Sequence, residues 1–106
     1  MKTLKFKDHL VQQILDGTKT TTWRLFDDKD LKIGDELSFL NADTGAEFAH
    51  AKITDITERE LKNIDPITYQ KTYTNLNEMI EHYHGFYGDR VNENSLMKMI
   101  TFKLLF

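Results

Sequence analysis

The stretch that decides the fold is ILDGTKTTTWR, residues 14–24. Gly17 follows apolar residues at helical spacing, and it is a typical helix stop because glycine adopts left-handed backbone angles without strain. The threonines after it favour a strand, since β-branched side chains lose rotamer freedom in a helix. The stretch therefore predicts a helix that ends in a glycine turn and leads directly into a polar strand.

Upstream of this stretch, Leu4 and Phe6 alternate with Lys5 and Lys7, which predicts a short first strand. Asp8 is expected to cap the helix that follows. The apolar residues of that helix recur at helical spacing, at Leu10, Val11, Ile14 and Leu15. The first quarter of the chain is thus expected to run from strand to helix to strand.

Downstream, residues 25–34 are polar and predict a loop, and residues 36–40 resume strand-like alternation. Residues 41–45 combine Asn, Asp and Gly, which tolerate the backbone angles of a tight turn. Residues 47–56 are expected to form the returning strand. Its apolar positions alternate imperfectly, which predicts a β-bulge.

The last third of the chain predicts a second helix and a final strand. Residues 57–72 are mixed, with a short helical piece expected around residues 58–63. Asn75 is expected to cap the helix, and Glu78, three positions on, to bond back to the cap's amide. The buried stripe of this helix is expected at Leu76, Met79, Ile80 and Tyr83. A glycine-punctuated loop over residues 84–89 and a strand over residues 97–106 complete a small α+β domain with a curved sheet or barrel.

Composition sets outer limits on organisation and location. With 106 residues, of which 40% are hydrophobic, the chain suffices for one core and is expected to be a single domain, residues 1–106. It contains no cysteine, which excludes disulfides, thiolate zinc sites and a cysteine nucleophile, and fits a reducing compartment. The start of the chain does not resemble a signal peptide, and no stretch approaches a membrane span. A cytoplasmic location is therefore expected, with no membrane partner.

The charge is unevenly distributed. The formal net charge of −3 argues against coating duplex DNA through bulk electrostatics. Residues 1–24 nevertheless carry +3, so the remainder carries −6. Positive charge is therefore concentrated around the stretch quoted first, although scattered surface lysines can produce the same imbalance.

That stretch resembles the signature of the ASCH family, Gly-x-Lys-x-x-x-x-Arg, with Gly17, Lys19 and Arg24 at its three positions. Gly34 and Asp35 resemble the family's later Gly-Asp element, which leads into a barrel strand, and the resemblance covers nearly the whole chain. It implies a PUA-like β-barrel, here with two main helices, a cleft beside the motif, and an association with RNA.

Strand geometry predicts which side chains of residues 19–24 lie on the same face. In a regular strand Thr20, Thr22 and Arg24 share one face, while Thr21 and Trp23 share the other. An ammonium group from Lys19, hydroxyls and a guanidinium would then converge on one cleft that suits a nucleotide-like ligand. The alternative is a solvated surface on which Lys19 and Arg24 pair with acidic residues of the following loop, Asp27, Asp28 or Asp30.

A sharper implication comes from one branch of ASCH-like proteins, similar in length, that hydrolyses the acetamide of N(4)-acetylcytidine. Its lysine and threonine match Lys19 and Thr22, of which the threonine would attack and the lysine would assist its deprotonation. Its glutamate has no match, because this chain has Gln70, Lys71, Thr72 and Tyr73 there. Glu78 is the nearest candidate for the third catalytic residue, although its capping position already explains it, and Glu58 and Glu60 are further candidates.

Aromatic residues near the motif are candidates for stacking on a base. Tyr87, in the expected glycine-rich loop, is the better one, whereas Trp23 is expected in the core. The four histidines have no spacing typical of zinc, so neither a metal nor another cofactor is expected.

Three functions therefore stay open. The first is binding of RNA or a modified nucleoside, with Thr20, Arg24 and Tyr87 in contact with it. The second is a metal-independent amidohydrolase acting through Lys19, Thr22 and Glu78. The third is a protein-interaction domain without catalysis.

Overall fold

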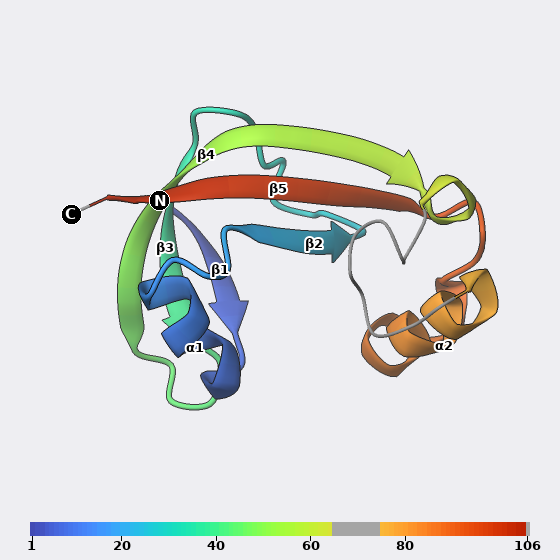
Figure 1. Cartoon of the computed structure of the whole chain (residues 1–106), viewed down its shortest axis with the longest axis horizontal. Coiled ribbons are helices and arrows are strands. Elements are labelled where there is room, and N and C mark those ends of the chain that lie inside the picture. Colours follow the sequence, from blue (N-terminus) through green and yellow to red (C-terminus); the bar gives the residue numbers. More distant parts are fainter. Residues whose placement is uncertain (65–74, 106) are drawn as a thin grey trace.

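The computed structural model describes residues 1–64 and 75–105. Within them, five strands form one sheet in the order β1-β3-β4-β5-β2, with β1 and β3 parallel and the other pairs antiparallel. The strands are β1 (Lys2–Phe6), β2 (Thr21–Leu25), β3 (Glu36–Asn41), β4 (Glu47–Glu60) and β5 (Leu96–Leu105). The sheet curls into a half-barrel, so the predicted α+β class is confirmed (Figure 1).

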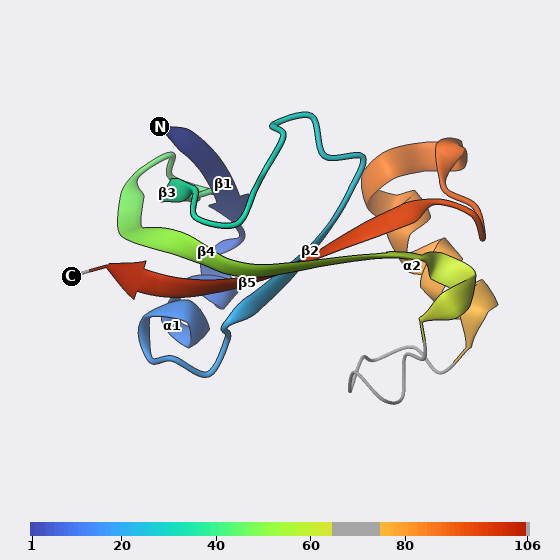
Figure 2. The same cartoon turned by 90° about the horizontal axis from the view of Figure 1, so that it is seen from above.

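Two helices lie at the two ends of the long β4–β5 pair. Helix α1 (Asp8–Leu15) is beside the end that carries β1 and β3, and helix α2 (Leu76–Tyr87) is beside the other end (Figure 2). Two single-turn 3-10 helices, η1 (Leu61–Asn63) and η2 (Gly88–Arg90), flank α2 along the chain. No helix in this described part of the protein is long and apolar enough to cross a membrane.

Strand β5 contributes to two hydrophobic cores. Met97 and Met99 pack with residues of α2, whereas Ile100 and Phe102 pack with α1 and the β1–β3 end. Successive side chains of a strand point to opposite faces, so the two cores lie on opposite faces of the sheet. The first core contains Leu4, Phe6, Ile14, Leu31, Leu37, Phe39, Ala51, Ile53, Ile100 and Phe102. The second contains Leu25, Leu61, Ile64, Met79, Tyr83, Val91, Met97 and Met99.

Helix α1 begins one residue earlier than expected. The prediction that Asp8 caps it is wrong, because Asp8 is its first residue and the preceding Lys7 makes no side-chain capping bond. The Asp8 carboxylate instead accepts a hydrogen bond from Asn41 Nδ2 at 3.0 Å, which ties α1 to the turn after β3. The predicted stop is confirmed, since Gly17 has a φ of +86° and its amide donates to the carbonyl of Ile14.

The predicted turn and bulge are both confirmed. Asn41 Oδ1 accepts from the amides of Asp43 at 2.8 Å and Thr44 at 3.3 Å, which closes the turn between β3 and β4. The register between β4 and β5 shifts between Ile53 and Asp55. A β-bulge of this kind adds twist, which helps the sheet to curl.

Strand β4 continues to Glu60, so the helical piece expected around residues 58–63 is shorter than predicted. Only Leu61–Asn63 is helical, as η1. Pairing with the start of β5 explains the difference, because residues 58–60 lie opposite residues 96–98. This long-range pairing is invisible to local sequence patterns.

The glycine-rich loop predicted over residues 84–89 is also wrong, because α2 runs through Gly85 to Tyr87. Its packing outweighs the helix-weakening effect of one glycine, since Met79 and Tyr83 are buried in the second core. Gly88, with a φ of +76°, ends the helix. At the other end Asn75 Oδ1 accepts from the amide of Glu78 at 2.9 Å, which confirms the predicted cap.

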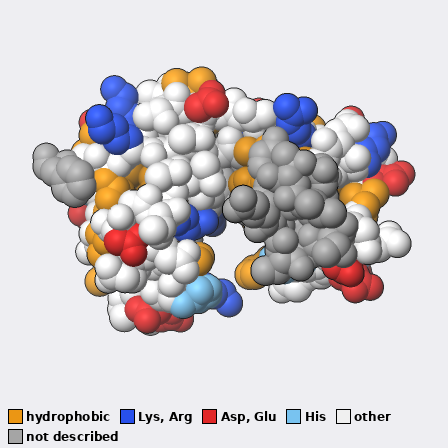
Figure 3. All heavy atoms as spheres, in the orientation of Figure 1, with side chains coloured by type: hydrophobic (Ala, Val, Ile, Leu, Met, Phe, Trp, Pro, Cys, Tyr) orange, Lys and Arg blue, Asp and Glu red, His pale blue; other side chains and the backbone are white. Residues whose placement is uncertain are grey.

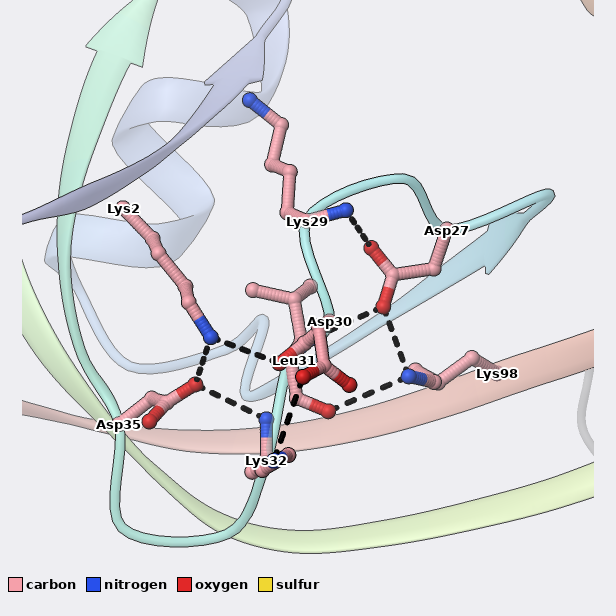
Figure 4. A network of polar contacts seen from close by, with 8 residues as sticks. All are labelled: Lys2, Asp27, Lys29, Asp30, Leu31, Lys32, Asp35 and Lys98. Carbon is pink, nitrogen blue, oxygen red and sulfur yellow. Dashed lines mark hydrogen bonds and ion pairs between the residues drawn. The ribbon is translucent and has the colours of Figure 1, made fainter.

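Ion pairs hold the loop between β2 and β3 against the sheet (Figure 4). Lys98 of β5 pairs with Asp27 at 2.7 Å and donates to the Leu31 carbonyl at 3.2 Å. Lys2 of β1 pairs with Asp35 at 2.8 Å. The Asp27–Lys98 pair is the more sheltered of the two, because the side chain of Asp27 is only 7% exposed.

Asp27 is also bonded by two amides of its own loop. Burial acts to raise its pKa, but hydrogen bonds from Lys98 and from the amides of Leu31 and Lys29 outweigh burial and hold the pKa below its ordinary value. The folded state therefore binds a proton at Asp27 less readily than the unfolded chain does. The contribution of Asp27 to stability is present above the unfolded pKa and is lost as the pH falls through the folded one.

We expect Asp27→Asn to lower the free energy of unfolding by about 2–4 kcal/mol at pH 7, because it leaves the ammonium of Lys98 without its charged partner. The difference from wild type should shrink below about pH 4, near the pKa of an unfolded aspartate. Urea unfolding at several pH values measures both effects. The exposed neighbour provides the control, since Asp28→Asn should change stability by less than about 0.5 kcal/mol. A constant loss from pH 7 to pH 3 would contradict this account.

Candidate functional site

Strand β2 presents the motif residues alternately to the two faces of the sheet. It pairs with β5 without a register shift, with Thr22 opposite Ile100 and Arg24 opposite Lys98. Thr22 and Arg24 therefore share the face of the first core, as expected for a regular strand. Trp23 lies on the other face, half-buried against the second core, which agrees with its predicted place in the core.

The other motif residues lie at the opposite end of β2 from Arg24. Lys19 is half-buried and Thr20 is exposed, and both line a cleft of about 360 Å³ beside the end of α1. The carbonyl of Thr20 accepts from the amide of Phe102, so the backbone here is fixed to β5. Thr22 lies between the two ends and is 5% exposed. Lys19 and Arg24 thus belong to the walls of two different clefts.

Arg24 has an unusual environment for a cation. Its guanidinium lies over the ring of Phe6, 5.0 Å from the ring centroid, and Nη2 donates to the carbonyl of Lys5 at 3.0 Å. Its Nε is buried and has no hydrogen-bond partner among the residues that the structure describes. Buried donors are rarely left unpaired, so this one calls for an explanation.

The acidic residues expected to neutralise Arg24 have other partners. Asp27 pairs with Lys98, and Asp30 pairs with Lys32 at 3.2 Å. Among the described residues no carboxylate forms an ion pair with Arg24. The alternative of a solvated ion-paired surface therefore does not describe Arg24.

Burial lowers the pKa of Arg24, and the nearby phenol of Tyr87 acts in the opposite direction. A guanidinium nevertheless stays protonated in proteins because its unperturbed pKa is so high. Arg24 is therefore a half-buried positive charge whose described surroundings do not neutralise it. Such a charge is costly unless something binds it.

Arg24 opens onto a cleft of about 400 Å³ on its face of the sheet. The other residues that line this cleft are Phe26, Asp27, Glu58, Asn94, Leu96 and Lys98. The cleft combines charged side chains of both signs, an amide and apolar side chains, so it offers hydrogen-bond donors, acceptors and a surface for a ring. In space-filling view the molecule is also hollowed between the part that carries α1 and the part that carries α2 (Figure 3).

Phe26 is one of four residues of this cleft that sequence reasoning missed, together with Asn94, Leu96 and Lys98. It is 37% exposed and has a φ of +53°, which is strained for an aromatic residue. The guanidinium of Arg90 lies 4.1 Å from its ring centroid, and Tyr87 packs against it edge-on at 5.6 Å. The sequence could have pointed to Phe26 only through its position two residues after Arg24. Its positive φ, which accompanies its place in the cleft, cannot be predicted from the residue type.

The remaining predicted site residues are dispersed. Tyr87, at the end of α2, supports Phe26 through the edge-on contact. Glu78 is exposed in the first turn of α2. Glu60 pairs with Lys62 at 3.6 Å, whereas Glu58 shares the cleft with Arg24. The positions where the hydrolase branch has its glutamate, residues 70–73, lie outside the described residues. No cluster of His, Asp or Glu among the described residues could hold a metal ion.

Solved structures of low sequence identity share this fold. A DUF984 protein from Enterococcus faecalis V583 has a TM-score of 0.74 at 16% identity, over 99% of this chain and 76% of its own. The ASCH domain from Lactobacillus crispatus JV V101 has a TM-score of 0.65 at 16% identity, over 92% of this chain and 70% of its own. ASCH from Zymomonas mobilis has a TM-score of 0.64 at 9% identity, over 95% of this chain and 65% of its own.

No protein-family model matches the sequence, and no curated protein matches it either. The structural likeness confirms the fold implied by the Gly17, Lys19 and Arg24 pattern. At these low sequence identities the similarity supports a common fold and says nothing about the ligand.

We expect Arg24→Met to change the free energy of unfolding by less than about 1 kcal/mol, in either direction. The substitution loses one hydrogen bond and the contact with Phe6, but it also removes a half-buried charge without an ionic partner. Thermal or urea unfolding measures the result. A loss above about 2 kcal/mol would show instead that the guanidinium is there for stability.

Proposed function

We propose that this ASCH-like domain binds a nucleoside, free or within single-stranded RNA, in the cleft around Arg24. The observation that carries the proposal is the half-buried guanidinium of Arg24, which lines the cleft and has no carboxylate partner among the described residues. Guanidinium groups bind phosphates and the acceptor edges of bases through paired donors. A ligand of that kind would supply the negative charge or acceptor group that the described residues do not offer to this guanidinium.

The composition of the cleft supports a nucleoside. Its volume of about 400 Å³ lies in the range of small-molecule sites. Phe26 and Leu96 offer apolar surface on which a base can lie, and Glu58 and Asn94 offer polar groups at its margin. Aromatic side chains beside a cation are the usual means of holding unpaired bases. The acidic remainder of the chain makes extended contact with duplex DNA unfavourable.

Two arrangements favour binding over hydrolysis. Lys19 lines a cleft at the far end of β2 from Arg24, and Thr22 is almost fully buried between them. The glutamate of the hydrolase branch has no counterpart in the sequence, where residues 70–73 are Gln, Lys, Thr and Tyr. Glu78 lies in the first turn of α2, and its backbone amide donates to the cap residue Asn75. Amide hydrolysis through Lys19, Thr22 and Glu78 stays a second candidate on the motif match. An interaction domain would need none of these residues.

We expect short single-stranded RNA to bind weakly and to lose affinity with salt at a shallow slope, on the order of two or three released ions. Arg24→Met should weaken binding at least about tenfold, since it removes a charge-assisted contact. Titration followed by NMR measures the affinity. Arg59→Met is the control, because Arg59 lies opposite Met97 and so on the other face of the sheet. Equal losses in both variants would point to bulk charge, and no binding by wild type would favour an interaction domain.

The hydrolase alternative has its own assay, in which acetate release from N(4)-acetylcytidine is followed. If wild type turns over, Thr22→Ala and Lys19→Ala should abolish turnover and shift stability by roughly 1 kcal/mol. Glu78→Gln then decides the third residue, because loss of turnover at an unchanged melting temperature assigns it to catalysis. Normal turnover with slightly lower stability assigns it to the cap of α2. No acetate from wild type would eliminate this alternative.

A further inference from the structure

Two charges of opposite sign line the Arg24 cleft and form no ion pair with another described residue. They are Arg24 and Glu58. Arg24 lies opposite Lys98 across β2 and β5, and Lys98 lies opposite Glu58 across β5 and β4. The three therefore form a row across one face of the sheet, with the backbones of Arg24 and Glu58 about 10 Å apart, two strand spacings.

The middle residue of the row does not neutralise either end. The ammonium of Lys98 is bonded to Asp27 at 2.7 Å and to the Leu31 carbonyl at 3.2 Å, and its side chain is only 15% exposed. It is therefore committed to the loop between β2 and β3 (Figure 4). The carboxylate of Glu58 is an acceptor pair at one end of the row. At the other end the guanidinium of Arg24 has further N–H donors besides the one that bonds to the Lys5 carbonyl.

We infer that this row recognises the edge of a guanine base, an inference that rests on the proposed nucleoside site and names its specificity. The two oxygens of the Glu58 carboxylate would accept from the neighbouring N1–H and N2–H groups of guanine. The guanidinium of Arg24 would donate to O6 and N7, the acceptors that arginine commonly reads in guanine. Phe26 and Leu96 would lie against the plane of the base.

The other common bases complement this row less well. Adenine places a lone pair at N1 beside its amino group, which would face a carboxylate oxygen and be repelled. Cytosine offers one amino group and then an acceptor at N3, so it leaves one carboxylate oxygen unpaired. Uracil has a single N–H donor between two carbonyl oxygens. Guanine alone among them has two adjacent donors followed by acceptors, so it alone can pair with both the carboxylate and the guanidinium of this row.

The test compares four nucleoside monophosphates by calorimetry, because their phosphate contribution is the same. We expect GMP to bind at least about tenfold more tightly than AMP and CMP, because one good bidentate contact discriminates between bases by about 5- to 150-fold. IMP, which lacks only the N2 amino group, should bind about five- to tenfold more weakly than GMP. A tetranucleotide RNA with one guanine, compared with GMP, shows whether the base is taken from RNA or from a free nucleotide.

Glu58→Gln should weaken GMP at least about tenfold and bring GMP and IMP within about twofold of each other. Glu60→Gln is the matched control, since it removes the same charge two residues along the strand, from a side chain that pairs with Lys62. It should leave GMP affinity within about twofold. Tight binding of CMP or AMP, with Glu58→Gln without effect, would overturn the guanine assignment and leave the nucleoside site intact. Absence of binding by every nucleotide and RNA would overturn both.

Discussion

The unbroken register between β2 and β5 is the constraint on which the rest of the structure depends. On β5 it directs Met97 and Met99 into the second core and Ile100 and Phe102 into the first. On β2 it places Leu25 on the face of the second core and Arg24 on the face of the first. A slip by one residue would exchange the two faces and bury the charge of Arg24 in the second core. Both cores therefore hold the same register, and the position of the cleft follows from it.

Stability and the proposed binding of a ligand make opposite demands at Arg24. A fold selected only for stability would give this guanidinium a carboxylate partner or replace it with an apolar side chain. The chain instead assigns Asp27 to Lys98, which is held in the adjacent strand, and Asp30 to Lys32. The loop is thereby fixed without consuming the charge of Arg24. Natural proteins commonly tolerate such local costs at binding sites.

Much of the fold was predictable because its signals are local. Gly17, the Asn41 turn and the Asn75 cap each act within a few residues, and all three are confirmed. The failures have long-range causes. β4 extends to Glu60 because it pairs with β5, and α2 passes through Gly85 because its buried side chains outweigh one glycine. Asp8 bonds to Asn41, 33 positions away, instead of capping its own helix.

The site was less predictable than the fold. The face shared by Thr22 and Arg24 follows from strand alternation, but the separation of Lys19 from Arg24 follows from where β2 begins and ends. Phe26 enters the cleft through a positive φ, and Glu58 through the unexpected length of β4. No sequence motif predicts the position of Phe26 or Glu58, because both positions depend on the tertiary structure.

The pairing of β2 with the last strand has a consequence for how the protein is made. Lys98 reaches back 71 positions to Asp27, and the strand that carries it is the last element of the fold. Contacts between such distant positions slow folding, since a long loop must close before they are gained. During synthesis β2 has no partner until residues 96–105 have left the ribosome. The nascent chain therefore carries the motif of residues 17–24 well before it possesses the cleft, which can form only after β5 has been made.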